Sequence, residues 1–355
     1  MNTLRLSVDP GQLDSPSSRQ AIAQAAEILR SGGLVALPTE TVYGLGANAL
    51  DPEAVARIFQ AKQRPSWDPI ILHIAGPTLN NPMLASLTTE VAPVVQGLAH
   101  AFWPGPLTLL LPRSAAVPDA VTAGRPLVGI RMPAHPVAFE LIRLAGIPIA
   151  APSANLFSHI SPTTADHVLA DLDGRIDAVL DAGPTQHGVE STVLDPNQSP
   201  MMIYRPGAVT AQQIREVAGP VSYFESNMLP QASPREALPS PGVGLRHYAP
   251  RAKLLLIEAP WTDLAQQLVD EASRQFGQKT GIMLPAELDS SLPLFKEVVV
   301  FRWGRWSALE ELARNLYAGL RSLDAQGCAV ILCPLPADEG LGAAIRDRLR
   351  KASRP

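Results

Sequence analysis

The chain alternates between two patterns of apolar and polar residues. Short apolar runs, such as LVAL at 34–37, have the length and composition of buried strands, whereas 18–33 and 51–62 repeat apolar residues at the spacing of a helix packed on a core. Asp51 and Pro52 match the N-cap and the first turn of the second helix. Further strands are predicted near 70–74, 107–111, 127–132, 147–151, 177–182, 191–195 and 201–205, and further helices near 90–102, 136–145, 162–172 and 210–218.

This interleaving of strands and helices predicts one α/β domain over residues 1–218. Residues 219–251 have scattered prolines and no sustained period, which is typical of a linker. The alternation returns over 252–355 and predicts a small parallel α/β domain of Rossmann-like type. Its strands are expected near 252–258, 280–284, 297–301 and 328–333, and its helices near 261–277, 307–325 and from 339.

Composition and charge narrow the class of protein. Of the 355 residues, 46% are hydrophobic, which is enough for real cores in two domains. Lys and Arg total 29 against 33 Asp and Glu, so a net charge of −4 argues against a general surface for nucleic acid, and any anion site must be local. The N-terminus lacks the apolar core of a signal peptide, and no apolar stretch approaches the ~20 residues of a membrane helix. We therefore expect a cytoplasmic protein with no membrane association and no stable binding of nucleic acid.

Two cysteines and several missing motifs narrow the chemistry. Cys328 and Cys333 lie five residues apart, on opposite faces of a predicted strand, so we expect buried thiols rather than a disulfide or a shared metal site. The chain contains no Walker A sequence, no complete G-x-G-x-x-G, no H-E-x-x-H and no G-x-S-x-G. If phosphates bind, side-chain cations and hydroxyls must hold them.

Most candidate polar residues also have an ordinary structural explanation. Lys62 and Arg64 suit the C-terminus of a helix, where cations are favourable. The segment PSAN at 152–155 could be a simple turn, and His73, on an apolar strand, could be a core residue. Arg131 is different, because a cation inside an apolar strand needs a partner.

Taken together, these positions favour a binding site. Hydroxyls, cations and a histidine recur in strands or at strand ends, and strands that share a sheet would bring several of them together. Guanidinium groups match phosphates and carboxylates, so the set suits a triphosphate beside a small molecule that carries a carboxylate. Its members are Thr39, Thr41, Lys62, Arg64, His73, Arg131, Ser153, Asn155, Ser191 and Arg205.

In its motifs the chain resembles the YrdC-type L-threonylcarbamoyladenylate synthases, in their long two-domain form. The resemblance rests on PTETVYGLGANA, IFQAKQRP, WPGPLTLLL, GIRMPAHP, IAAPSAN and GVESTV, and beyond them on SPGVGLRHYAP and GLGAAIRDRLRKAS. It implies a large twisted mixed sheet with flanking helices, followed by the small Rossmann-like domain.

The resemblance also implies a nucleotidyltransferase. Such an enzyme joins L-threonine, bicarbonate and ATP into threonylcarbamoyl-AMP and pyrophosphate, with Mg²⁺ carried on the ATP phosphates and no metal ligand from the protein. A partner transferase complex then passes the threonylcarbamoyl group to the adenosine beside the anticodon of tRNA.

The roles of single residues follow from the same resemblance. It implies that Lys62 and Arg64 are catalytic and also bind the nucleotide. Threonine is expected to contact Thr41, His73, Arg131, the backbone near Ala151, and Ser191. The other residues expected to bind the nucleotide are Asp68, Ser153, Asn155, Ser161, Arg205 and Leu245. The chain departs from the family pattern at Asp68, usually Asn, at Leu127, often Thr, and at Leu245, often Tyr, so the resemblance has less weight there.

The linker has two possible roles. Its end is rich in turn formers and carries Arg246, His247 and Tyr248, so we expect a lid over the bound nucleotide; the alternative is a plain tether.

Two other functions stay open beside the synthase. A related carbamoyltransferase would need cysteine zinc fingers, which two cysteines cannot build, and an RNA-binding protein would need a basic face.

Overall fold

The computed structural model describes residues 2–78, 80–224, 238, 240, 247–288 and 297–354. These residues group into two compact units. The first contains 2–78, 80–157, 162–186, 190–224, 238 and 240, and the second contains 158–161, 187–189 and the described residues from 247 onward. The domain boundaries predicted at 218 and 251 stay a prediction.

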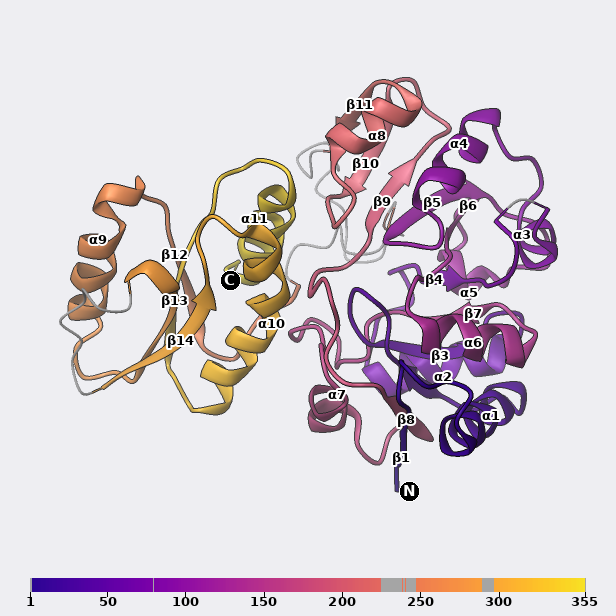
Figure 1. Ribbon diagram of the computed structural model, residues 1–355, viewed down its shortest axis with the longest axis horizontal. Helices are drawn as coiled ribbons and strands as arrows, with labels where there is room; N and C mark the ends of the chain where they lie inside the picture. Colours follow the sequence, from indigo (N-terminus) through magenta and orange to yellow (C-terminus); the bar gives the residue numbers. More distant parts are fainter. Residues whose placement is uncertain are drawn as a thin grey trace. The chain divides into compact units, whose positions relative to one another are not determined.

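The first unit is built on a mixed sheet, as predicted. Among the described residues, eleven strands pair in the order β1-β8-β2-β3-β7-β4-β6-β5-β9-β10-β11, with both parallel and antiparallel neighbours (Figure 1). The strands are β1 (Leu4–Ser7), β2 (Val35–Leu37), β3 (Gly44–Asn48), β4 (Ile71–His73), β5 (Leu107–Pro112), β6 (Leu127–Arg131), β7 (Ile149–Ala150), β8 (Ala178–Asp181), β9 (Thr192–Asp195), β10 (Met201–Arg205) and β11 (Val221–Tyr223). The helices are α1 (Pro16–Arg30), α2 (Pro52–Lys62), α3 (Pro82–Leu87), α4 (Pro93–Phe102), α5 (Asp119–Thr122), α6 (Pro136–Ala145), α7 (Ala165–Leu172) and α8 (Ala211–Ala218).

Helices cover both faces of this sheet because its central strands are apolar on both sides. Val35 and Leu37 belong to a core cluster with residues of α1 and α6, whereas Leu34 and Ala36 belong to a second cluster with residues of α2 and α7. Successive side chains of a strand point to opposite faces, so this alternation places one core on each side.

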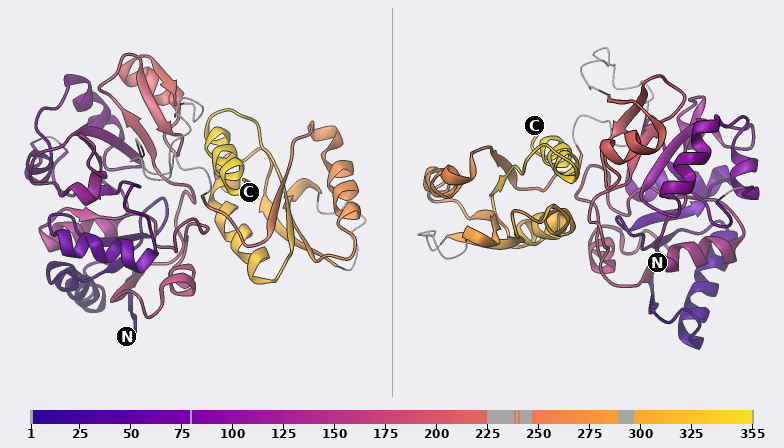
Figure 2. Two further views of the ribbon diagram at one scale, coloured as in Figure 1. Left: turned by 180° about the vertical axis from the view of Figure 1, so that it is seen from behind. Right: turned by 45° about the horizontal axis from the view of Figure 1, so that its top comes forward.

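The second unit has a parallel sheet, also as predicted. Its strands β12 (Lys253–Ile257), β13 (Thr280–Pro285), β14 (Val298–Gly304) and β15 (Val330–Pro334) pair in the order β12-β15-β13-β14 (Figure 2). Its helices are α9 (Trp261–Arg274), α10 (Leu309–Ala325) and α11 (Leu341–Ala352), with a short 3-10 helix η2 (Ala286–Leu288). Cys328 and Cys333 are free and buried, which confirms the prediction of buried thiols.

Some short elements are not predicted by the sequence: β1, β3, β11, α3 and α5. In β3, Gly44 and Gly46 weaken the strand signal. A Cβ at Gly46 would lie 2.8 Å from Leu37 Cδ2, so a larger residue there would displace the side chain of Leu37. Strand β11 pairs with β10 and lies at the start of the segment predicted as a linker. The sequence does not predict this strand, because three residues are too few to show a period. None of the helices in the described part of the chain has the length and apolar character needed to cross a lipid bilayer.

Candidate functional site

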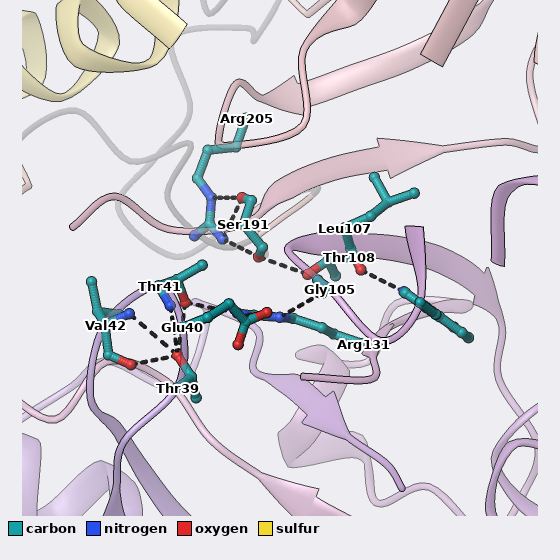
Figure 3. Close-up of polar contacts among 11 residues, drawn as sticks. Thr39, Glu40, Thr41, Val42, Gly105, Leu107, Thr108, Arg131, Ser191 and Arg205 are labelled. Carbon is teal, nitrogen blue, oxygen red and sulfur yellow. Dashed lines mark hydrogen bonds and ion pairs between the residues drawn. The ribbon is translucent and has the colours of Figure 1, made fainter. Parts of the chain in front are cut away.

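Arg131 is the centre of a buried polar cluster in the first unit. It ends β6 beside His73, its register partner at the end of the parallel strand β4. Its Nε donates to Gly105 O at 3.2 Å, its Nη1 donates to Thr41 Oγ1 at 2.9 Å, and its Nη2 lies 2.6 Å from Glu40 Oε1 (Figure 3). The sequence predicts that Arg131 has a partner but does not say which residue it is. The structure identifies that partner as Glu40.

The loop between β2 and β3 holds this cluster in place. Thr39 Oγ1 donates to Val42 O at 2.6 Å and lies 2.8 Å from Thr41 Oγ1 (Figure 3). Since Thr39 uses its proton on Val42, the hydroxyl of Thr41 donates to Thr39 and accepts from Arg131. The orientation of each group in the loop is thereby fixed.

The charges of the cluster balance one another. Burial opposes ionisation of Glu40, but the Arg131 guanidinium outweighs it, and the pKa of the carboxyl lies below its usual value. Burial, reinforced by the charge of Arg131, lowers the pKa of His73 to about 3. At neutral pH the cluster therefore holds one cation, one anion and a neutral imidazole.

A second network joins β5, β9 and β10. Ser191 Oγ lies 2.8 Å from Thr108 Oγ1. Arg205 Nη2 donates to Ser191 Oγ at 3.1 Å, and its Nε and Nη2 donate to Ser191 O at 3.1 and 3.0 Å (Figure 3). Thr108 is a further residue that the sequence alone did not identify, although a lone hydroxyl in the apolar run LTLLL was the available signal.

The turn after β10 packs against the backbone on both sides of Ser191. A Cβ at Gly207 would lie 2.4 Å from both Glu190 O and Thr192 N. The YRPG segment thus packs directly against the backbone of GVEST, which leaves room for glycine and nothing larger.

A third cluster contains Lys62, Arg64 and Asp68, all buried. Lys62, the last residue of α2, donates from Nζ to the carbonyls of Ser153 and Asn155. Arg64 Nη2 donates to Pro69 O at 2.7 Å and lies 2.9 Å from Asp68 Oδ2. Lys62 and Arg64 are therefore each held against fixed acceptors, in a segment that also contains Pro65 and Pro69.

Burial sets the ionisation of this third cluster. It lowers the pKa of Lys62 well below its usual value, and the nearby Arg64 acts in the same direction. It raises the pKa of Asp68, against the opposing charges of Arg64, Lys62 and Arg205. Asp68 Oδ1 is buried and has no hydrogen-bond partner among the described residues.

The first unit contains most of the predicted site residues, in the three clusters just described. Ala151 follows β7 and its N–H donates to Ile71 O at 3.0 Å. Leu127 lies at the opposite end of β6 from Arg131. Among the described residues, no group of three or more His, Cys, Asp or Glu side chains is arranged to hold a metal ion.

The other predicted residues fall elsewhere. Ser161 is buried and groups with the second unit, where its carbonyl accepts from Arg321 Nε at 3.4 Å. Tyr248 also groups with that unit: its ring stacks on Tyr317 at 5.8 Å, and Arg348 lies 5.2 Å from the ring centre. Its neighbour His247 is buried. Leu245 and Arg246 lie outside the described residues.

Comparisons with known proteins agree over nearly the whole chain. Residues 27–207 match the family model of Sua5, YciO and YrdC proteins, described as telomere recombination. Residues 209–354 match the model described as threonylcarbamoyl-AMP synthase, C-terminal domain. The threonylcarbamoyl-AMP synthase of Bacillus subtilis is 43% identical over 354 residues, which cover 99% of this chain and 98% of the relative.

Two solved structures match closely as well. Sua5 of Pyrococcus abyssi complexed with L-threonine has a TM-score of 0.89 and 40% identity, covering 99% of this chain and 98% of that chain. A variant of the same protein, with a histidine and the following tyrosine replaced by alanine, has a TM-score of 0.89 and 39% identity, covering 99% and 96%.

Proposed function

The chain belongs to the Sua5/YrdC family of threonylcarbamoyl-AMP synthases, and from this premise we propose that it joins L-threonine, bicarbonate and ATP into threonylcarbamoyl-AMP and pyrophosphate. The observation in the site that carries the proposal is the buried guanidinium of Arg131. It contacts the hydroxyl of Thr41, the carbonyl of Gly105 and the carboxylate of Glu40. The same unit holds Lys62, Arg64 and Arg205 in fixed positions. The guanidinium of Arg131 suits an amino-acid carboxylate, and the other three cations suit phosphates.

The threonine carboxylate binds Arg131 in this proposal. Nε and one donor of Nη1 are used by Gly105 and Thr41, and Nη2 is paired with Glu40, so a second donor on Nη1 and one on Nη2 remain. Thr41, His73, the backbone near Ala151, and Ser191 complete the threonine site. Ser191 is held for this role by Thr108 and Arg205.

The nucleotide binds along Lys62, Arg64, Ser153, Asn155, Ser161 and Arg205. Lys62 fixes the backbone at Ser153 and Asn155 and, with Arg64, stabilises charge that develops on the α-phosphate and on the leaving pyrophosphate. The two carbonyl contacts hold Lys62 Nζ in a fixed place, and a bound phosphate beside it would favour the protonated, charged form that burial alone disfavours.

Mg²⁺ carried on the phosphates belongs to the proposal as well. When bound, it would neutralise phosphate charge and orient the leaving group. Asp68 fits as a protein contact, because its Oδ1 is a hard oxygen with no hydrogen-bond partner among the described residues.

The residues act by positioning rather than by covalent catalysis. The threonine ammonium gives up one proton to water, and the amine then attacks the carbon of bicarbonate; one water leaves, which gives a carbamate. A carbamate oxygen next attacks the α-phosphate, and pyrophosphate leaves. Arg131 fixes the carboxylate end, and neutral His73 can accept or donate one hydrogen bond without adding charge. Holding the labile carbamate against the phosphate and excluding water supplies most of the acceleration.

The segment ending in Leu245, Arg246, His247 and Tyr248 is the lid of the proposal. His247 and Tyr248 are an adjacent histidine and tyrosine, the same two residue types that alanines replace in the solved variant of the relative. The product passes in the cytoplasm to a transferase complex that modifies tRNA. The match of residues 209–354 to the synthase C-terminal domain favours this function over a carbamoyltransferase.

The experiment that tests the function is direct detection of the product. Purified chain is incubated with ATP, L-threonine, Mg²⁺ and ¹³C-labelled bicarbonate, and the nucleotides are analysed by mass spectrometry. We expect an adenylate that contains threonine and one labelled carbon. AMP or ADP as the sole nucleotide product would contradict the proposal.

A further inference from the structure

Glu40 is a buried acid to which the resemblance assigns no role. It lies in the loop between β2 and β3, is 2% exposed, and faces the guanidinium of Arg131 at 2.6 Å (Figure 3). Burying an ionised carboxylate costs free energy unless a nearby positive charge compensates it. Its neighbours Thr39 and Thr41 are fixed by hydrogen bonds, so the carboxylate has a defined place next to the predicted threonine carboxylate.

Glu40 helps to set the direction of the donors that Arg131 keeps for a ligand. Contacts with Gly105, Thr41 and Glu40 engage Nε, Nη1 and Nη2 respectively, which fixes the plane of the guanidinium. The two remaining donors match a carboxylate that binds with both oxygens.

Glu40 also changes the charge that a ligand meets. Arg131 and Glu40 together are neutral, and His73 adds no charge at neutral pH. Arg205 belongs to the second network, where its Nε and Nη2 donate to Ser191 rather than to the Arg131 cluster. A simple carboxylate would add one uncompensated negative charge to this buried cluster, whereas a zwitterionic amino acid would add none.

We propose that Glu40 is a specificity-determining residue: by compensating Arg131, it makes the site select a zwitterionic amino acid over a simple carboxylate anion. The proposal rests on the proposed function, in that the cluster around Arg131 is taken as the threonine site. Glu40 does not react; it acts on the ligand through Arg131 and through its own charge.

The first test uses the unaltered full-length chain and three ligands in titration calorimetry. They are L-threonine, (R)-3-hydroxybutyrate, which lacks the ammonium, and L-threonine amide, which lacks the carboxylate. We expect each singly charged analogue to bind at least about tenfold more weakly than threonine. Binding of (R)-3-hydroxybutyrate as tight as that of threonine would overturn the proposal. A chain that binds none of the three would overturn the proposed function itself.

The second test changes the charge of Glu40 and keeps its size. Glu40→Gln retains an oxygen for Arg131 Nη2 but leaves the site cationic. We expect the ratio of threonine affinity to (R)-3-hydroxybutyrate affinity to fall by about tenfold or more. A purely structural role would change both affinities together and leave the ratio unchanged.

Glu140→Gln is the matched control. Glu140 pairs with Arg143 on α6 at the same distance of 2.6 Å, but this ion pair is far more exposed. We expect its affinity ratio to equal that of the unaltered chain. A folded Glu40→Gln variant with that same ratio would overturn the proposal. If Glu40→Gln does not fold, rejection of both analogues by the unaltered chain supports the proposal, and acceptance of the anion overturns it.

Discussion

At the scale of the residue, Arg131 connects the fold to the substrate. We expect Arg131→Ala to lower L-threonine affinity by about 100-fold or more and to leave ATP affinity nearly unchanged, because the lost group serves the carboxylate. The change also leaves Glu40 buried without its counter-ion, which costs about 3–5 kcal/mol of stability.

Arg131→Lys separates these two effects. It keeps the charge beside Glu40 but loses the planar fork, so stability should recover more than threonine affinity does. Calorimetric titrations with threonine and with ATP, together with urea unfolding, measure all three quantities. Unchanged threonine affinity in either folded variant would refute the assignment.

His73 makes stability depend on pH. Burial holds its pKa at about 3 in the folded chain, below the usual value of 6.5. The unfolded chain therefore binds a proton that the folded chain does not, and the free energy of unfolding falls as pH drops from about 6.5 toward 3. Between pH 7 and pH 5, the loss due to this one group is about 2 kcal/mol.

We expect His73→Gln to remove that part of the pH dependence. Urea unfolding at pH 7 and at pH 5 measures the difference for each protein. The variant should lose less stability than the unaltered chain on going to pH 5. Equal losses in the two proteins would show that the pKa of His73 is not lowered in the folded chain.

At the scale of the element, the turn after β10 sets the position of Ser191. Gly207→Ala would place a methyl group 2.4 Å from Glu190 O and Thr192 N, and backbone atoms cannot move aside without moving Ser191. We expect a loss of about 1–3 kcal/mol in stability and a larger fall in turnover than stability alone explains.

Gly97→Ala in α4 is the control for this change. A Cβ at Gly97 meets nothing within 4 Å, and alanine in a helix is favoured over glycine by about 1 kcal/mol. Pyrophosphate release and thermal unfolding compare the two variants. If Gly207→Ala is as active as Gly97→Ala, then the turn does not position Ser191.

The elements also show what the sequence can predict. Long periodic segments such as α2, with Asp51 as its N-cap, are predicted well, because several local signals agree. Short elements such as β3 and β11 are not, because glycines or few residues hide the period.

The sequence likewise reveals some residues of the site and not others. Arg131 stands out because a cation in an apolar strand is unusual, whereas Glu40 and Thr108 gain a role only from partners distant in sequence. Glu40 meets Arg131 across 91 positions, and Thr108 meets Ser191 across 83. No local pattern encodes such a meeting; only the pairing of the strands creates it.

At the scale of the whole molecule, the lid hypothesis concerns the segment that ends at Tyr248, which separates the strands of the two sheets in the sequence. Trypsin has cleavage sites after Arg235 and Arg246. We expect nucleotide together with threonine to slow cleavage there by about tenfold or more, because a lid orders when it closes on ligand. Cleavage of an unrelated peptide substrate added to the same samples serves as the reference for trypsin activity. Equal cleavage with and without ligands would leave the tether as the explanation.

The central claim is that threonine, bicarbonate and ATP meet in one site and react together. The most direct measurement is pyrophosphate release by the full-length chain, with each of the three substrates omitted in turn. The account predicts rapid release when all three are present and near-background release when any one is absent, because the carbamate is the nucleophile that attacks the α-phosphate. Release that continues without L-threonine would contradict it.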